Sequence, residues 1–203
     1  MKKNKIKLII LDLYGVIVLG SYKETCIYMS KKYKLSFQLL WDTFYVKYFN
    51  QAALGKITDQ QSFQYAIREL NIPIKWDVLY KKHLSFLTLS KQSFEYAKSL
   101  QRRGYKILLL SKNTPLQFKD IVKKTKVNKY FKNIINTYDL GLPKASQATM
   151  RYITKKFKVK PGEVIIVDDY KDNLVIPKKI GMHAFHYTNY KKMRREMSAC
   201  LKN

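Results

Sequence analysis

The chain has 203 residues, 46% of them hydrophobic, and a formal net charge of +26 at pH 7. The apolar content is enough for a buried core, which excludes a disordered chain, and no apolar run reaches the roughly 18 to 20 residues of a membrane span. Two cysteines, Cys26 and Cys200, have neither metal-ligand spacing nor the number for a disulfide framework, so we expect a soluble, cytoplasmic protein.

Four short apolar segments predict buried strands, and each ends at or near polar residues. They are 6–11 before Asp12, 105–110 before Ser111, 133–136 before the loop to Lys144, and 164–167 before Asp168 and Asp169. Helix-length amphipathic stretches follow the strands, around residues 90–102, 115–125, 145–157 and 171–181. This alternation predicts an α/β fold with a doubly wound, Rossmann-like parallel sheet.

The stretch 20–89 interrupts the alternation of strands and helices. Apolar residues recur there with helical spacing over 23–33, 37–49, 59–70 and 76–86. We therefore predict two parts, a core made of residues 1–19 and 90–203 and an inserted four-helix cap of residues 20–89. The aromatic side chains of the cap are mostly core by their spacing, and we expect one or two to face the crevice and select the substrate.

In open α/β sheets, ligands bind in the crevice at the carboxyl ends of the strands. Asp12, Ser111, Lys144, Asp168 and Asp169 all fall at such ends. A second interpretation remains for Ser111, which stands before Pro115 and is also placed to cap the helix that follows. Asp168 and Asp169 also have a second interpretation, in which they cap a turn at the surface.

Four segments, in this order, resemble the signatures of the haloacid dehalogenase-like (HAD) superfamily. They are LDLYGVI at 11–17, LS at 110–111, LGLPK at 140–144 and VDDYKDN at 167–173. Residues 180–187 also resemble the final strand of that family, and the inserted helices resemble a subclass I cap. The resemblance spans nearly the whole chain and implies a hydrolase of the phosphatase-like branch.

The resemblance implies a role for each of the polar residues. Asp12 would attack a phosphorus atom, and Lys144 and Ser111 would assist as catalytic residues. Mg²⁺ would be held by the metal ligands Asp12, Tyr14 through its main-chain carbonyl, Asp168 and Asp169. The substrate-binding residues would be Ser111, Lys112 and Asn113, although relatives often carry asparagine where this chain has Lys112. Together these roles imply a Mg²⁺-dependent phosphatase for a small phosphorylated metabolite, acting through an aspartyl-phosphate.

Tyr14 departs from the pattern, because most phosphatases of the family carry a second aspartate there as general acid and base. Tyrosine at this place is found in dehalogenases of the family, so a 2-haloacid dehalogenase is the alternative. Those enzymes use an arginine at the start of the cap and replace the metal-binding acids, whereas here no arginine precedes Arg68 and Asp168 and Asp169 are kept. The acids favour phosphate as the substrate.

The basic residues leave a third hypothesis open, a catalytically weak nucleic-acid-binding protein on the same scaffold. A field of this sign attracts phosphate, nucleic acid and anionic membranes alike. The lysine pairs are spread along the whole chain instead of forming one arm or stripe. A solvated, lysine-rich surface is therefore the favoured interpretation, and a small phosphorylated substrate is the favoured partner.

Overall fold

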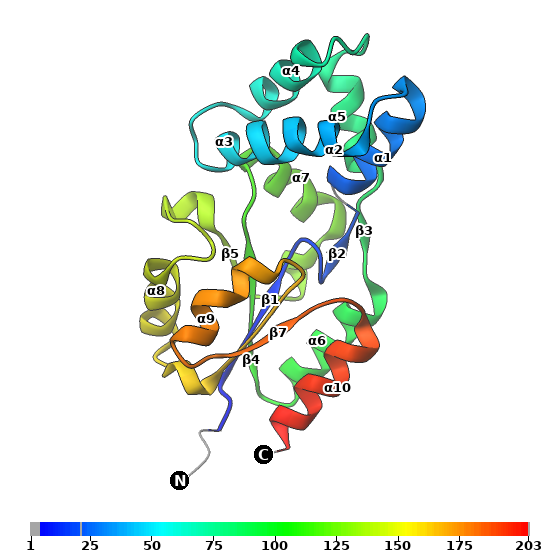
Figure 1. Cartoon of the computed structure of the whole chain (residues 1–203). Helices are drawn as coiled ribbons and strands as arrows, with labels where there is room; N and C mark the ends of the chain where they lie inside the picture. Colours follow the sequence, from blue (N-terminus) through cyan, green and yellow to red (C-terminus); the bar gives the residue numbers. More distant parts are fainter. Residues whose placement is uncertain (1–4, 21, 203) are drawn as a thin grey trace.

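The computed structural model describes residues 5–20 and 22–202. Residues 1–4 of the predicted core and Ser21 of the predicted cap lie outside the described residues. The chain forms two lobes, a larger one built on a sheet and a smaller one made of helices, and the described part of the chain begins and ends at the end of the larger lobe away from the helical lobe (Figure 1). No helix within 5–20 and 22–202 has the length and apolar character needed to cross a membrane.

A parallel five-stranded sheet forms the centre of the larger lobe. Its order is β5-β4-β1-β6-β7, with bounds Asn133–Asn136, Lys106–Ser111, Leu8–Asp12, Val164–Asp168 and His183–His186. Every neighbouring pair of strands is parallel. This confirms the predicted α/β class, and it places β1 at the middle of the sheet, where the strand order reverses direction.

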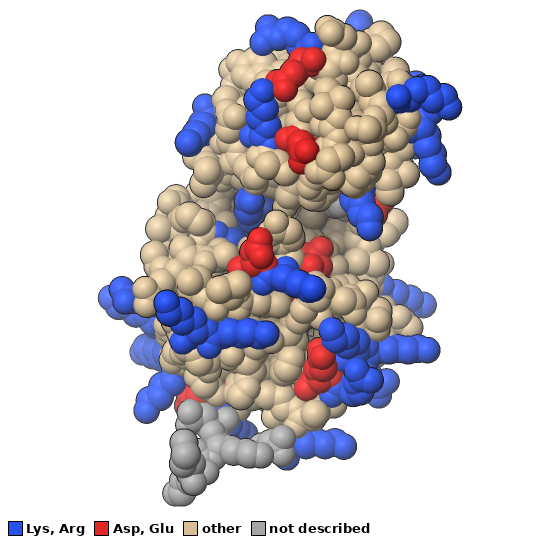
Figure 2. Space-filling model, in the orientation of Figure 1, with Lys and Arg blue, Asp and Glu red and all other residues tan. Residues whose placement is uncertain are grey.

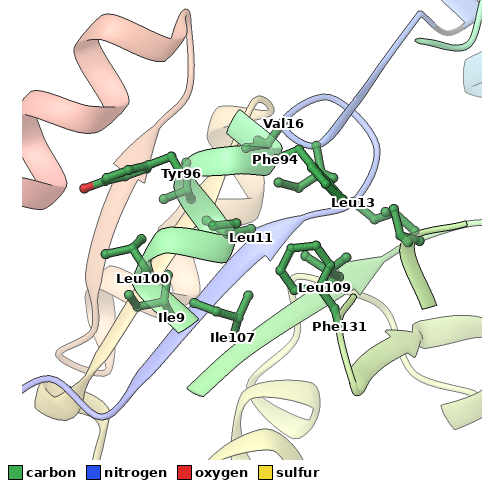
Figure 3. Packing of buried hydrophobic residues seen from close by; sticks show 14 of the residues in the cluster. Ile9, Leu11, Leu13, Val16, Phe94, Tyr96, Leu100, Ile107, Leu109 and Phe131 are labelled. Carbon is green, nitrogen blue, oxygen red and sulfur yellow. The ribbon is translucent and has the colours of Figure 1, made fainter. Parts of the chain in front are cut away.

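Helices cover both faces of the sheet. One face packs against α6 (Lys91–Arg102), α7 (Pro115–Thr125) and α10 (Tyr190–Leu201), and the other against α8 (Gln147–Phe157) and α9 (Val175–Lys179). In β1, Ile9 and Leu11 belong to the first cluster, whereas Leu8 and Ile10 belong to the second. Figure 3 shows the first cluster, in which Phe94 and Leu100 of α6 lie over the strands. Burial on both sides explains why the strand sequences are continuously apolar.

Short 3₁₀ turns complete the larger lobe, at Val127–Lys129, Thr137–Leu140, Pro161–Glu163 and Lys171–Leu174. The last of them changes one expectation. The single helix predicted around 171–181 begins as this 3₁₀ turn and continues as the short α9, so the acidic loop is followed by tight turns instead of one long helix.

In the sequence, the helical lobe is inserted between two short strands, β2 (Val18–Leu19) and β3 (Thr88–Leu89), which pair with each other in antiparallel orientation. Its segments are α1 (Tyr22–Tyr33), α2 (Phe37–Trp41), a π-helix (Asp42–Phe49), α3 (Asn50–Ala53), α4 (Asp59–Glu69) and α5 (Trp76–Ser85). The helix predicted over 37–49 therefore continues to Ala53 and is π-helical in its middle. A helical cap on a Rossmann-like core is confirmed, while the division at residues 20 and 89 stays a prediction.

The two connections between the lobes approach each other closely at Gly20. Its φ is +86°, and a Cβ atom there would lie 1.9 Å from the carbonyl oxygen of Phe86. Only glycine avoids that collision while adopting a positive φ. The helical lobe also has its own apolar cluster, which includes Phe44, Phe63 and Leu79, so it packs as a unit above the sheet.

Candidate active site

A cavity of about 530 Å³ lies between the two lobes, above the carboxyl ends of the central strands. The space-filling view shows a hollow at this level, with acidic and basic side chains beside it (Figure 2). Of the residues predicted from the sequence, Asp12, Tyr14, Lys112, Lys144 and Asp169 line it. Asp12 is the last residue of β1, so the central strand delivers its carboxylate directly to the floor of the cavity.

Lys144 connects two buried carboxylates at this floor. Its Nζ lies 2.6 Å from Oδ1 of Asp12 and 2.7 Å from Oδ2 of Asp168, and the lysine is 4% exposed. Burial alone would lower the pKa of Lys144, but the two carboxylates raise it above its ordinary value. Lys144 therefore remains a cation beside Asp12 at neutral pH, where it can stabilise negative charge on a bound anion.

Asp168 holds this lysine in place. Its Oδ1 accepts hydrogen bonds from the backbone N–H of Tyr170 at 2.9 Å and from Nδ2 of Asn173 at 3.0 Å, while Oδ2 faces Lys144. The 3₁₀ turn Lys171–Leu174 supplies Asn173, which explains why the acidic loop turns sharply after β6. Three donors on one carboxylate fix its orientation.

Three carboxylates form a cluster suited to a divalent cation. One oxygen each from Asp12, Asp168 and Asp169 can be chosen so that all lie within 4.8 Å of one another. Burial raises the pKa of Asp12 well above its usual value, and the neighbouring acids add to this while Lys144 opposes it. With all three carboxylates ionised and Lys144 protonated, the formal charge of this group is −2. Oxygen donors with this charge fit Mg²⁺, whose binding would favour ionised Asp12.

The turn after β1 is shaped around Asp169. Gly15 has a φ of +126°, and a Cβ atom there would lie 2.3 Å from the carboxylate carbon of Asp169. A glycine is therefore required for the two loops to meet, and this explains the glycine three residues after Asp12. Participation of the Tyr14 main-chain carbonyl in metal binding stays a prediction.

Ser111 ends β4 and is fully buried, and its Oγ has no hydrogen-bond partner within the described part of the chain. The interpretation of Ser111 as a helix cap is wrong, because α7 begins at Pro115 and Thr114 occupies the N-cap position. A buried hydroxyl without a partner is costly. Its proposed role as a ligand to a phosphoryl oxygen fits this observation.

Lys112 and Asn113 have different surroundings. Lys112 lines the cavity, and its Nζ donates to Oδ1 of Asn50 in the helical lobe at 2.7 Å. Asn113 is buried outside the cavity lining, where its N–H donates to Asn136 Oδ1 and its own Oδ1 accepts from the N–H of Thr114. Asn113 therefore shapes the loop after β4, and direct substrate contact by it stays a prediction.

Tyr14 reaches from the larger lobe into the helical lobe. Its hydroxyl lies 3.3 Å from Nε2 of His83 in α5, and Nδ1 of His83 lies 2.9 Å from Oγ1 of Thr25 in α1. Burial raises the pKa of Tyr14 well above 10, so the phenol stays protonated and is suited to donate to a neutral His83. Sequence reasoning missed His83, because a single histidine in an amphipathic helix carries no signal of a partner 69 residues away.

The chain is similar to known hydrolases in sequence and in fold. The profile of a haloacid dehalogenase-like hydrolase matches residues 6–174. No curated protein matches the chain significantly. Among solved structures, a HAD family enzyme from Bacteroides thetaiotaomicron, in complex with magnesium and inorganic phosphate, is 25% identical with a TM-score of 0.70 over 89% of this chain and 93% of its own.

Two further structures share the fold. A predicted HAD-like family hydrolase from Porphyromonas gingivalis is 20% identical, with a TM-score of 0.75 over 98% of both chains. An L-2-haloacid dehalogenase from Xanthobacter autotrophicus, with chloropropionic acid covalently bound, is 14% identical, with a TM-score of 0.66 over 96% of this chain and 83% of its own. At these identities the similarity shows the fold, and it does not choose between the two chemistries.

Proposed function

Because this chain belongs to the haloacid dehalogenase-like hydrolases, we propose that it is a Mg²⁺-dependent phosphatase that acts on a small phosphorylated metabolite. The observation that carries the proposal is the cluster of Asp12, Asp168 and Asp169 beside Lys144, whose formal charge is −2 when all three carboxylates are ionised. A site with surplus negative charge beside a nucleophile needs a cation before it can accept an anion. The similar enzyme that binds magnesium and inorganic phosphate supports the same assignment.

In this proposal Asp12 attacks the phosphorus atom of the bound ester. The new bond joins a carboxylate oxygen to phosphorus, the ester P–O bond breaks, and the leaving alkoxide takes a proton from water. A second water then attacks the aspartyl-phosphate, which frees phosphate and regenerates the Asp12 carboxylate. Mg²⁺, held by Asp12, Asp168 and Asp169 when bound, would supply positive charge to the phosphoryl oxygens. Lys144 would add a second positive charge near these oxygens, and the buried hydroxyl of Ser111 would donate to one of them.

The test is phosphate release from a panel of phosphorylated metabolites. We expect release with Mg²⁺ that EDTA abolishes and Mg²⁺ restores, and we expect Asp12→Asn to be inactive while it keeps the fold by circular dichroism. Asp139→Asn is the matched control, because Asp139 is an exposed aspartate outside the acidic cluster. This variant should keep wild-type activity. Activity that survives EDTA or Asp12→Asn would overturn the proposal.

The dehalogenase chemistry remains the second candidate, and Tyr14 favours it. In that reaction Asp12 would attack the carbon that carries the halogen and expel halide, without any need for a metal. The acid cluster argues against it, because a metal-free site gains nothing from three carboxylates in one place. Chloride release from 2-chloropropionate in the presence of EDTA would support this candidate, and no release from either enantiomer would remove it.

A further inference from the structure

The cavity has a polar floor and an aromatic roof. Asp12, Lys144 and Asp169 line the floor. On the side formed by the helical lobe, Trp41, Tyr45 and Phe49 line the cavity beside Lys23 and Glu24 of α1. The three aromatic residues are spaced four apart, from the end of α2 through the π-helix. That spacing puts their rings on one face of the helix, and π-helical turns are frequent at functional sites.

The three rings form a continuous stack. The ring centroids of Trp41 and Tyr45 are 4.3 Å apart at 28° between their planes, and those of Tyr45 and Phe49 are 5.2 Å apart at 14°. Trp41 and Tyr45 are half-buried, so each keeps part of its ring surface open. Because the rings stack on one another, the Tyr45 ring is covered on both faces and the stack presents ring edges to the cavity. A flat aromatic partner can meet these edges with its face, in the edge-to-face geometry, and displace water.

Lys112 adds one charged group beside this surface. Its Nζ lies 5.9 Å from the centroid of the Tyr45 ring and 5.7 Å from that of Phe49, and Asn50 accepts one of its hydrogen bonds. An ammonium has three donors, so this contact leaves capacity for an acceptor on a ligand. Lys112 thus stands beside the roof, whereas Lys144 pairs with Asp12 and Asp168 at the floor.

On the premise that the proposed phosphatase function holds, we infer that the substrate is a phosphate monoester whose alcohol carries a flat aromatic or heteroaromatic ring. The phosphate lies at the floor, the ring packs with its face against the edges of the Trp41–Tyr45–Phe49 stack, and an acceptor on the ring meets Lys112. The cavity volume of about 530 Å³ suits a ring joined to a phosphate. Sugar phosphates and aliphatic phosphates fill the same floor and leave the roof without a flat partner.

Two esters that differ only in the flatness of the ring test the inference. Benzyl phosphate and cyclohexylmethyl phosphate have the same reacting group and similar size. With Mg²⁺ present, we expect kcat/KM to be about tenfold higher for benzyl phosphate. Tyr45→Leu and Trp41→Leu should each reduce that preference while leaving inhibition by inorganic phosphate unchanged. Tyr48→Leu is the matched control, since Tyr48 lies in the same helix outside the cavity lining and should keep the preference.

Binding to Asp12→Asn separates failure of this inference from failure of the proposed function. If the wild type hydrolyses neither ester, the phosphatase proposal fails, and tighter binding of benzyl phosphate by calorimetry still supports an aromatic ligand. Equal hydrolysis or equal binding of the two esters overturns the inference while the phosphatase proposal stands. The role of Lys112 is tested with 4-carboxybenzyl phosphate, which carries an acceptor on its ring. In the wild type its kcat/KM should be higher than that of benzyl phosphate, and Lys112→Met should abolish this difference. An unchanged difference in Lys112→Met contradicts the role of Lys112.

Discussion

Tyr14 stands two residues after the proposed nucleophile and performs two structural tasks. Its backbone N–H donates to Oδ1 of Asp12 at 3.2 Å, and its hydroxyl lies against His83 in the helical lobe. A phenol whose pKa is raised by burial is a poor general base at neutral pH. The residue that replaces the usual second aspartate therefore connects the nucleophile loop to the helices above it.

Replacing Tyr14 with phenylalanine tests this interpretation. Because the hydroxyl is engaged with His83, we expect Tyr14→Phe to keep kcat within about threefold, whereas loss of a general acid or base would lower it by about 10²–10⁴-fold. The lost contact should lower the free energy of unfolding by about 1 kcal/mol. Steady-state kinetics and urea denaturation measure the two effects. A hundredfold fall in kcat would mean that the phenol takes part in proton transfer.

His83 makes stability depend on pH. Burial lowers the pKa of His83 to about 4, compared with about 6.5 in an unfolded chain. As the pH falls from 6.5 to 4, the unfolded chain gains a proton at this residue that the folded protein does not gain, so stability falls. We expect this residue to account for a loss of about 3 kcal/mol by pH 4, a loss present in the wild type and absent in His83→Gln.

The measurement is urea denaturation at several pH values between 7 and 4. The difference between the wild type and His83→Gln isolates His83 from the carboxylates that titrate in the same range. His183→Gln, at an exposed position, serves as the control and should follow the wild type. Parallel pH profiles for the wild type and His83→Gln would show that His83 is accessible to protons in the folded state.

Among the elements, α7 joins the two lobes. No side chain at its own N-cap, Thr114, bonds to the helix. Instead Asp59, the first residue of α4, accepts from the hydroxyl of Thr114 and, through Oδ2, from the N–H of Leu116 at 3.2 Å. Further along α7, Gln117 donates to the hydroxyl of Tyr22 at 2.6 Å and Asp120 accepts from Tyr80 at 2.8 Å. The helical lobe thus supplies the missing cap of a helix in the other lobe.

Removal of this carboxylate should weaken both α7 and the contact between the lobes. We expect Asp59→Ala to lower the free energy of unfolding by about 1–3 kcal/mol, because two donors in a largely buried contact lose their acceptor. Asp42→Ala removes an exposed aspartate of the same lobe and should change stability by less than about 0.5 kcal/mol. Guanidinium denaturation of the two variants compares them directly. Equal losses would mean that the contact with Asp59 contributes nothing specific.

For the whole molecule, the positive charge is distributed over both lobes. Lys and Arg number 40 against 14 Asp and Glu, and on the face shown in Figure 2 the basic side chains are scattered instead of gathered in one stripe. Such a surface attracts every polyanion, and exposed charges farther apart than about 8–10 Å are screened at physiological salt. A nucleic-acid-binding function therefore has no localised surface on this face.

Salt dependence distinguishes general attraction from a dedicated interface. We expect a fluorescent single-stranded oligonucleotide to bind at low salt and to dissociate by about 150 mM KCl, as fluorescence anisotropy would show. Inorganic phosphate at the proposed site should compete poorly with the oligonucleotide, because the two bind different surfaces. Binding that persists near 150 mM KCl and depends steeply on the salt concentration would support a nucleic-acid-binding function.

The sheet and the polar residues at the ends of its strands could be predicted from the sequence, because both follow from local patterns. Runs such as 6–11 and 164–167 are apolar on both faces, and the residues that follow each run must lie at the carboxyl edge of a parallel sheet. The π-helical segment Asp42–Phe49 and the 3₁₀ start of the helix after Asp168 were not predicted. Their hydrogen-bond patterns depend on packing, and no sequence periodicity distinguishes them.

The sequence by itself determined the fold class, the hydrolase family and the residues that could form an acidic site, because hydrophobic periodicity and short motifs act over a few neighbouring residues. Only the tertiary structure decided how these residues pair. It brought Lys144 between Asp12 and Asp168, turned Tyr14 towards His83 and set the Trp41, Tyr45 and Phe49 rings over the floor. The contacts of Lys144 and Tyr14 join residues from 24 positions apart, for Lys144 and Asp168, to 132 positions apart, for Lys144 and Asp12. Their distances depend on how whole helices and strands pack together.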